Sequence, residues 1–225
     1  MKVYGSPSSQ QANIGADGYN EEIVQNEIAD LYLPELTRHG IEVMRNNPAN
    51  NYADHVRESN LFKPDFHIAM HSNASAASSS HTARGCCVYC FDPMDRNNPG
   101  TLLAEYLHSF FMEIPVVNNR GIRSGKLFLS EIAKTTAPAV LVEIDFHDNA
   151  AGARWIIEHK KEIANAYLLG TLTAFGIPYI PIILTPSYIY RVQVGAFRFE
   201  KYALLQQEKL KEAGFDSIIR KEELK

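Results

Sequence analysis

Two apolar, β-prone segments of this chain carry side chains that can take part in catalysis. Phe66–Asn73 carries an imidazole at His71, and Ala139–Asp145 carries a carboxylate at Glu143. In open α/β sheets, ligands bind and chemistry takes place at the carboxyl ends of the strands. A histidine and a glutamate that converge there form the minimum set for metal-assisted hydrolysis. The alternative is that the two side chains are unrelated polar ends of separate strands.

Strand-like and helical segments alternate through the first 175 residues. Strands are expected at Lys2–Gly5, Ile41–Arg45, Phe66–Ser72, Cys86–Phe91, Lys126–Leu129 and Ala139–Asp145. Helices are expected at Glu21–His39, Tyr52–Leu61, Gly100–Phe111 and Ala150–Phe175, with a kink or an early end at Pro34. The alternation predicts an α/β fold, with a mostly parallel, twisted sheet and helices on both faces.

The carboxy-terminal part follows a different pattern. Residues 176–187 contain Pro178, Pro181 and Pro186, which predicts an extended linker. Residues 188–225 then predict a strand over Tyr188–Phe197, a helix over Glu200–Ala213, and a second strand over Phe215–Arg220. We therefore expect a domain of residues 1–175, the Pro-rich linker, and a small C-terminal β-α-β unit.

Composition excludes several classes of protein. The net charge is −4 and the cations are scattered, which argues against a nucleic-acid-binding protein. No run approaches the roughly 18 apolar residues of a membrane-spanning helix. Cys86, Cys87 and Cys90 lie in one strand-like run, which indicates buried small hydrophobic residues rather than a disulfide framework or a redox or metal site. Residues 1–7 lack the apolar core of a signal peptide, so we expect synthesis in the cytoplasm.

A second candidate carboxylate stands at the start of the first helix. Glu21 precedes Val24, Ile28 and Leu31 by three, seven and ten residues, so it is expected to share their inward face. Its neighbour Glu22 is expected to face solvent. The alternative for Glu21 is a favourable charge at the helix amino terminus.

A second histidine precedes the first on the same strand face. His71, at the strand end, is a good type of zinc ligand. His67 lies four residues earlier, about 13 Å away along the strand. Because that separation is too large for a shared metal, His67 is expected to be packed or hydrogen-bonded.

Four segments of residues 1–175 together resemble the zinc-dependent N-acetylmuramoyl-L-alanine amidases of the amidase-3 family. In chain order they are Asn20-Glu21 with Ile28-Ala29, Ile68–Asn73, Asn119–Ile122, and Val140–Glu143 with Phe146–Asn149. This family cuts the bond between the glycan and the stem peptide of peptidoglycan. The resemblance implies a zinc site with ligands Glu21 and His71, Glu143 as catalytic acid and base, and Asn73, Asn119 and Arg120 as substrate-binding residues.

The sequence departs from the family pattern at one zinc ligand. The family has a histidine in a loop after the first strand, and here that position falls on Ser9, a poor zinc ligand. The third ligand is then expected from His147, four residues after Glu143, with Gln10 as the alternative. A histidine merely hydrogen-bonded in its loop is the competing interpretation of His147.

Residues 188–220 resemble the first half of a SPOR domain, a module that binds glycan strands stripped of stem peptides. A SPOR domain has two β-α-β repeats, and only one is present here. A single repeat exposes apolar sheet surface, so it is expected to pair with a second copy in a homodimer. The alternative is a degenerate tail.

The expected function is a zinc amidase that hydrolyses the bond between N-acetylmuramic acid and L-alanine in bacterial peptidoglycan. Without an export signal, it would act at the cell wall after release, as an endolysin or a mother-cell lysis enzyme. A second hypothesis is a catalytically impaired amidase-like protein that binds peptidoglycan, which the Ser9 loop favours. A zinc carboxypeptidase or aminopeptidase acting on free peptides is a third.

Overall fold

The computed structural model describes the chain except for residues 77, 116–117, 182–191 and 223–225. It divides into two compact units, Met1–Ile180 and Pro181–Lys225. The three-part division expected from the sequence, with its 176–187 linker, stays a prediction.

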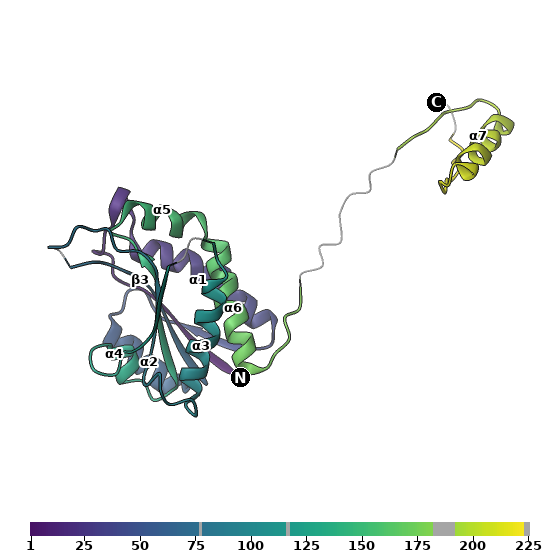
Figure 1. The fold of residues 1–225 in the computed structure, drawn as a ribbon. Coiled ribbons are helices and arrows are strands. Elements are labelled where there is room, and N and C mark those ends of the chain that lie inside the picture. Colours follow the sequence, from purple (N-terminus) through teal and green to yellow (C-terminus); the bar gives the residue numbers. More distant parts are fainter. Residues whose placement is uncertain (77, 116–117, 182–191, 223–225) are drawn as a thin grey trace. The chain divides into compact units, whose positions relative to one another are not determined.

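A six-stranded sheet forms the centre of the first unit (Figure 1). Its strands are β1 (Lys2–Pro7), β2 (Glu42–Arg45), β3 (Phe66–Asn73), β4 (Cys86–Cys90), β5 (Asn119–Ser124) and β6 (Ala139–Phe146), in the order β2-β1-β3-β6-β4-β5. Neighbouring strands are parallel, except that β4 runs antiparallel to β6. The reversal brings the starts of β4 and β5 to the edge where β1, β3 and β6 end.

Helices cover both faces of this sheet, which confirms the expected α/β fold (Figure 1). They are α1 (Glu21–Arg38), α2 (Tyr52–Phe62), α3 (Pro99–Met112), α4 (Ser130–Ala133), α5 (Ala150–Glu158) and α6 (Lys160–Phe175), with a 3-10 turn, η1, at Ala16–Gly18. Helices α1, α3, α5 and α6 pack on one face and α2 and α4 on the other.

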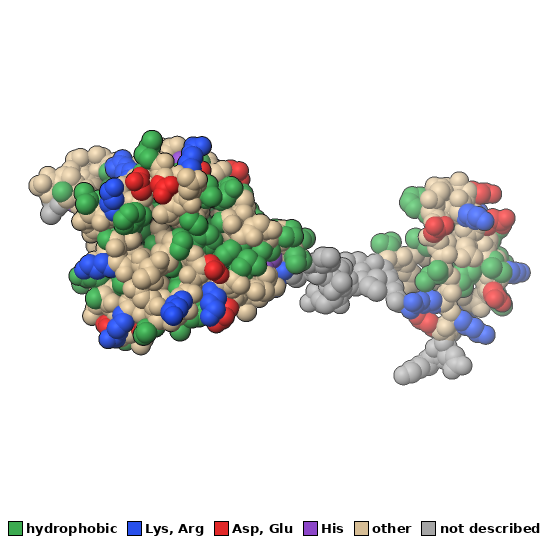
Figure 2. All heavy atoms as spheres, turned by 90° about the horizontal axis from the view of Figure 1, so that it is seen from below, with side chains coloured by type: hydrophobic (Ala, Val, Ile, Leu, Met, Phe, Trp, Pro, Cys, Tyr) green, Lys and Arg blue, Asp and Glu red, His purple; other side chains and the backbone are tan. Residues whose placement is uncertain are grey.

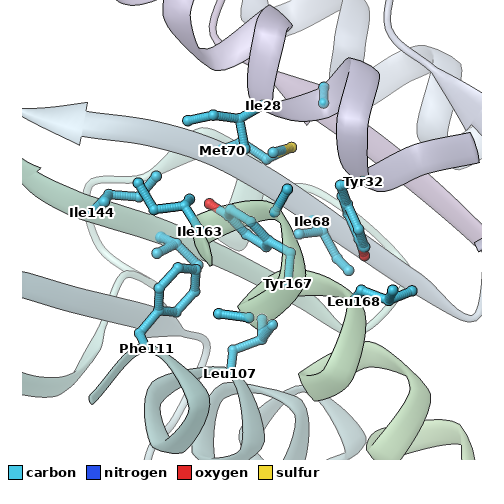
Figure 3. Packing of buried hydrophobic residues seen from close by; sticks show 14 of the residues in the cluster. Ile28, Tyr32, Ile68, Met70, Leu107, Phe111, Ile144, Ile163, Tyr167 and Leu168 are labelled. Carbon is cyan, nitrogen blue, oxygen red and sulfur yellow. The ribbon is translucent and has the colours of Figure 1, made fainter. Parts of the chain in front are cut away.

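The larger core lies between the sheet and helices α1, α3 and α6. Figure 3 shows Ile68 and Met70 of β3 facing this layer, where Tyr32, Phe111 and Tyr167 fill the space between the helices. Because side chains alternate along a strand, the intervening residues of β3 belong to the opposite face. There Ala69 packs in a smaller cluster, and His67 and His71 share its side. The alternation therefore separates the apolar core from the polar face that carries the histidines.

One predicted strand is wrong. Lys126–Leu129 is not a strand, and the edge strand β5 is instead the more polar segment Asn119–Ser124. The apolar side chains that suggested a buried strand are largely in solvent, since Leu127 is 89% and Phe128 66% exposed. The amide of Leu129 instead bonds the carbonyl of Gly125 in a tight turn that leads into α4.

Three helix predictions need correction. Helix α1 continues through Pro34 to Arg38 because Leu33 and Leu36 are buried on either side of the proline. Leu31 is exposed and Tyr32 is buried, since eleven residues after Glu21, not ten, make about three full helical turns. The predicted helix Ala150–Phe175 is two helices that meet at His159, which ends α5 and precedes α6.

The three cysteines are buried and free, as predicted. On the face seen in Figure 2, cationic and anionic side chains are interspersed and form no continuous basic stripe. Within the described ranges, every helix is too short or too polar to cross a membrane.

In the described part of the second unit, neither predicted strand is formed. Its described part contains α7 (Glu200–Glu212), whereas residues 192–197 and 215–220 are not in strands. The rest of the first predicted strand, residues 188–191, lies outside the described residues. Helix α7 buries none of its side chains. A strand needs a hydrogen-bonded neighbour, and a single repeat of this length buries too little apolar surface to hold two strands together.

Candidate active site

The two strand ends singled out from the sequence converge. Strands β3 and β6 are parallel neighbours in register, with His71 directly paired to Glu143. The side chains therefore project from adjacent backbone positions on the same face of the sheet. This confirms the expected meeting of an imidazole and a carboxylate near the carboxyl edge.

Glu21 reaches this pair from the first turn of α1. The side chain of Asn20 accepts a hydrogen bond from the amide of Ile23, so α1 begins at Glu21. Glu21 is only 1% exposed, and its Oε1 lies 2.9 Å from Nδ1 of His71 and accepts from the amide of Ser72 at 3.1 Å. The predicted inward direction of this carboxylate is confirmed. Burial alone raises the pKa of Glu21, but the contact with His71 and the other hydrogen bonds hold it below its ordinary value.

His71 lies between two carboxylates. Its Nδ1 faces Glu21, and its Nε2 lies 3.6 Å from Oε2 of Glu131 on α4. Burial alone lowers the pKa of His71, but the carboxylates of Glu131 and Glu21 raise it well above its ordinary value. Both ring nitrogens are thus directed toward anionic groups.

Glu131 is a buried residue of this site that the sequence analysis missed. Its Oε1 accepts a hydrogen bond from the hydroxyl of Ser6 and lies 3.1 Å from Nε2 of His67. His67 is fully buried, and its Nδ1 lies 2.9 Å from the hydroxyl of Ser59. Burial alone raises the pKa of Glu131, but the contacts with His67 and His71 hold it far below its ordinary value. His67 is hydrogen-bonded, as predicted.

No spacing motif marks Glu131 in the sequence. The signal that could have found it is a carboxylate between Leu129 and Ile132 in an otherwise apolar segment. We predicted a strand immediately before it, whereas the chain turns there and places Glu131 over the sheet. The error in the local structure therefore concealed the site residue.

Glu143 differs from Glu131 in its hydrogen-bond partners. Its Oε2 is buried without a hydrogen-bond partner among the described residues. Burial raises the pKa of Glu143 to about 7; the nearby Glu21 adds to the rise and His71 opposes it. A carboxyl group with a pKa near neutrality can take up and release a proton in the same reaction cycle.

His147 lies in a neighbouring hydrogen-bond network. Its Nδ1 is 2.9 Å from the hydroxyl of Ser72, and its Nε2 is 3.2 Å from the side-chain oxygen of Asn13. The ring also stacks on Tyr19, with 5.3 Å between ring centroids. Asn13 in turn donates a hydrogen bond to Glu21. His147 therefore contacts Ser72 and Asn13, two residues that donate hydrogen bonds to Glu21, and each of the two ring nitrogens of His147 has a partner.

A cavity of about 980 Å³ opens over His71 and Glu131. It is lined by residues 7–13 and by the segments 48–52 and 54–55. Ser9 and Gln10, which replace the histidine loop of the family pattern, therefore line the same space as His71. This cavity provides the room for a ligand beside the site.

The three predicted substrate-binding residues lie near this edge of the sheet. Asn73 ends β3, and Asn119 and Arg120 begin β5. The side-chain oxygen of Asn119 lies 2.9 Å from Nε2 of His108 and accepts from the amide of Gly121. Arg120 lies over the ring of Phe146, at the end of β6. Because β4 and β5 run opposite to β6, Asn119 and Arg120 at the start of β5 lie at the edge of the sheet where β6 ends.

Two side chains of the site, Glu21 and His71, are suited to bind a zinc ion. A carboxylate oxygen of Glu21 and a ring nitrogen of His71 are 2.9 Å apart, close enough for both to bind one cation, and both are common zinc ligands. In the part of the chain that the structure describes, no group of three or more His, Cys, Asp and Glu side chains is arranged to hold a metal ion. Of the two candidates for a third ligand, Gln10 lines the cavity beside His71, whereas both ring nitrogens of His147 contact Ser72 and Asn13.

Most of the chain is similar in sequence or in fold to known N-acetylmuramoyl-L-alanine amidases. The sporulation-specific N-acetylmuramoyl-L-alanine amidase of Bacillus subtilis (strain 168) is 22% identical over 97% of this chain and 84% of its own length. Among solved structures, the amidase AmiC2 of Nostoc punctiforme has a TM-score of 0.69 at 20% identity, over 78% of this chain and 97% of its own.

The catalytic domain of CwlV, an amidase from Bacillus (Paenibacillus) polymyxa var. colistinus, has a TM-score of 0.66 at 20% identity. It covers 79% of this chain and 100% of its own. The model of the Amidase_3 family, described as N-acetylmuramoyl-L-alanine amidase, matches residues 5–172, a range that includes Glu21, His71 and Glu143. The chain therefore belongs to the Amidase_3 family of N-acetylmuramoyl-L-alanine amidases.

Proposed function

We propose that this family member is a zinc-dependent amidase that hydrolyses the bond between N-acetylmuramic acid and L-alanine in peptidoglycan. The observation that carries the proposal is Glu143, whose burial raises its pKa to about 7, in register beside His71. That is the acid–base property required of a group that first takes a proton and then returns it.

Glu21 and His71 would hold the zinc ion, which would supply a Lewis acid to the scissile carbonyl. We propose Gln10 rather than His147 as the third protein ligand. Gln10 lines the same cavity as His71, whereas both ring nitrogens of His147 contact Ser72 and Asn13.

Glu143 would act as general base and then as general acid. Its buried carboxylate takes a proton from the attacking water and passes it to the nitrogen of the departing L-alanine. The cavity beside His71 would hold one side of the scissile bond. Asn73, Asn119 and Arg120 would contact the substrate, with their amide and guanidinium groups as hydrogen-bond partners for sugar and peptide.

The central test is incubation of the zinc-loaded protein with purified sacculi, followed by detection of free stem peptides that carry new L-alanine amino termini. Release of these peptides is expected, and Glu143→Gln is the matched variant, whose release should be about 10² to 10⁴ times slower. Sacculi that stay intact but retain the bound protein would favour the second hypothesis, a binding protein, which Ser9 in place of the family histidine supports. Cleavage of free peptides in place of sacculi would favour a peptidase.

The third ligand can be tested by paired substitutions. Gln10→Ala should weaken zinc retention in dialysis against a chelator, and His147→Ala should change it less. The reverse result would assign the role to His147. Equal retention in both variants would place the third ligand elsewhere.

We also propose a lytic role at the cell wall after release from the cytoplasm. The relative matched over 97% of this chain is named as sporulation-specific, which favours mother-cell lysis over an endolysin. Native protein found in the medium of intact, growing cells would contradict this proposal.

The C-terminal unit would bind glycan and pair with a second copy, as a partial SPOR domain. Helix α7 exposes Leu204 and Leu205, apolar side chains that a partner would cover. A dimer is expected in sedimentation at micromolar concentration, and a monomer there would exclude the pairing.

A further inference from the structure

The side of His71 opposite Glu21 carries an unassigned carboxylate. Nδ1 of His71 faces Glu21 at 2.9 Å, and Nε2 faces Oε2 of Glu131 at 3.6 Å. The two carboxylates therefore approach opposite nitrogens of one ring. Because a cation shared with Glu21 would bind at Nδ1, Glu131 is on the wrong side of the ring to be its ligand.

The contacts of Glu131 hold its carboxylate in one orientation. Oε1 contacts Ser6 and His67, and His67 is held in turn by Ser59. Glu131 and His67 are both buried, with 6% and 0% of their surface exposed. Since Oε1 is occupied by these groups, Oε2 is the oxygen left to face His71. A buried network in which each member has a partner is rigid.

A neutral imidazole carries its proton on one nitrogen and offers a lone pair on the other. A negative oxygen 3.6 Å from Nε2 favours the proton on that nitrogen. Histidines that bind metals commonly direct their other nitrogen to a carboxylate, which fixes the tautomer and the ring orientation. The arrangement around His71 has this form.

We propose that Glu131 is a positioning residue that keeps the ring proton of His71 on Nε2, so that Nδ1 offers its lone pair to the zinc ion shared with Glu21. The inference rests on the proposed zinc site. It gives a role to a residue outside the segments that resemble the family, and it explains why the carboxylate of Glu131 on α4 lies beside two histidines of β3.

The test measures zinc binding by full-length protein and its variants in competition with a chromophoric chelator. Glu131→Met keeps a similar length but removes the acceptor, and zinc affinity should fall about tenfold or more. Glu131→Gln keeps an acceptor without the charge, and the loss should be smaller, about threefold to tenfold. Thr171→Val is the matched control, because it removes a buried hydroxyl that bonds Tyr32 on the other face of the sheet, and it should leave zinc affinity unchanged.

A second measurement reports the tautomer directly. Ring ¹⁵N chemical shifts of His71 in the zinc-bound protein should show metal on Nδ1 and hydrogen on Nε2, and in Glu131→Met this pattern should be partly lost. If Glu131→Met does not fold, Glu131→Gln alone decides the question.

Zinc affinity of Glu131→Gln within twofold of the native protein, or metal on Nε2 of the native His71, would overturn the proposal. Tight zinc binding without release of stem peptides would overturn the proposed amidase activity but leave this role of Glu131 intact. A native protein that binds no zinc would overturn both proposals.

Discussion

Two glutamates of the first unit, the half-buried Glu143 and the buried Glu131, show how surroundings decide what one side chain can do. Glu143 has an oxygen without a hydrogen-bond partner among the described residues, and burial raises its pKa to about 7. Glu131 contacts Ser6, His67 and His71, and its pKa lies far below the ordinary value. The first glutamate can exchange a proton near neutral pH, whereas the second stays charged and can hold a histidine in place. The difference comes from the hydrogen-bond partners, because burial raises the pKa of both carboxyl groups and only Glu131 has partners that lower it below the ordinary value.

The largest effect is expected at Glu143. Glu143→Gln keeps the shape of the side chain but removes its ability to take up a proton, and peptide release should fall by a factor of about 10² to 10⁴. The rate of the zinc-loaded protein should rise as pH increases through the pKa of Glu143, since the base must be ionised, and the zinc ion would hold that pKa below the metal-free value of about 7. The measurement is the initial rate of L-alanine amino-terminus formation between pH 5 and 9. A variant with more than a tenth of native activity would remove Glu143 from the mechanism.

A large effect on stability is expected at Glu131. Glu131→Met leaves Ser6, His67 and His71 without their acceptor, and the free energy of unfolding should fall by roughly 3 kcal/mol. The native contribution is present above the ordinary carboxyl pKa and is lost as pH falls below it, because the folded-state pKa is depressed. Urea denaturation at pH 7 and at pH 4 measures both effects. An unchanged unfolding midpoint at pH 7 would show that the network does not stabilise the fold.

Substitution of Glu143 is expected to raise the free energy of unfolding at high pH, whereas substitution of Glu131 is expected to lower it. Its folded pKa of about 7 exceeds its ordinary value of 4.5, so the folded state retains a proton that the unfolded chain loses as pH rises between them. Stability should therefore decrease with pH across this range, and Glu143→Gln should be more stable by about 1–3 kcal/mol at pH 8. At pH 4 the two proteins should unfold alike. Thermal unfolding of chelator-treated samples tests this, and a less stable variant at pH 8 would contradict it.

The smallest effect on the fold is expected from removal of the second unit. Because α7 buries none of its side chains, deletion of residues 181–225 should change the stability of the first unit by less than about 0.5 kcal/mol. The shortened protein should keep its amidase activity and bind sacculi more weakly. Pull-down with sacculi and thermal unfolding provide the two measurements. Undiminished binding to sacculi would leave the proposed role of the second unit without support.

The sequence by itself determined those features that depend on local pattern. Apolar strands and amphipathic helices predicted the α/β sheet, and the polar residue at the end of β3 pointed to His71. The spacing of Glu21 from Val24 and Ile28 predicted its inward direction. These features follow from the periods of strand and helix, which are properties of neighbouring residues.

Only the tertiary structure decided the surroundings of the charged groups. Glu131 is 60 residues from His71 in sequence, yet α4 brings its carboxylate to the histidine. The antiparallel position of β4 likewise determined that Asn119 and Arg120 begin β5 near the end of β6. The strands predicted in the second unit are not formed in its described part, also because of tertiary contacts. Alternating side chains can define two faces of a strand, but a strand also needs a hydrogen-bonded neighbour, which the alternation does not supply. Burial and hydrogen-bond partners belong to contacts between distant segments, and no local spacing encodes them.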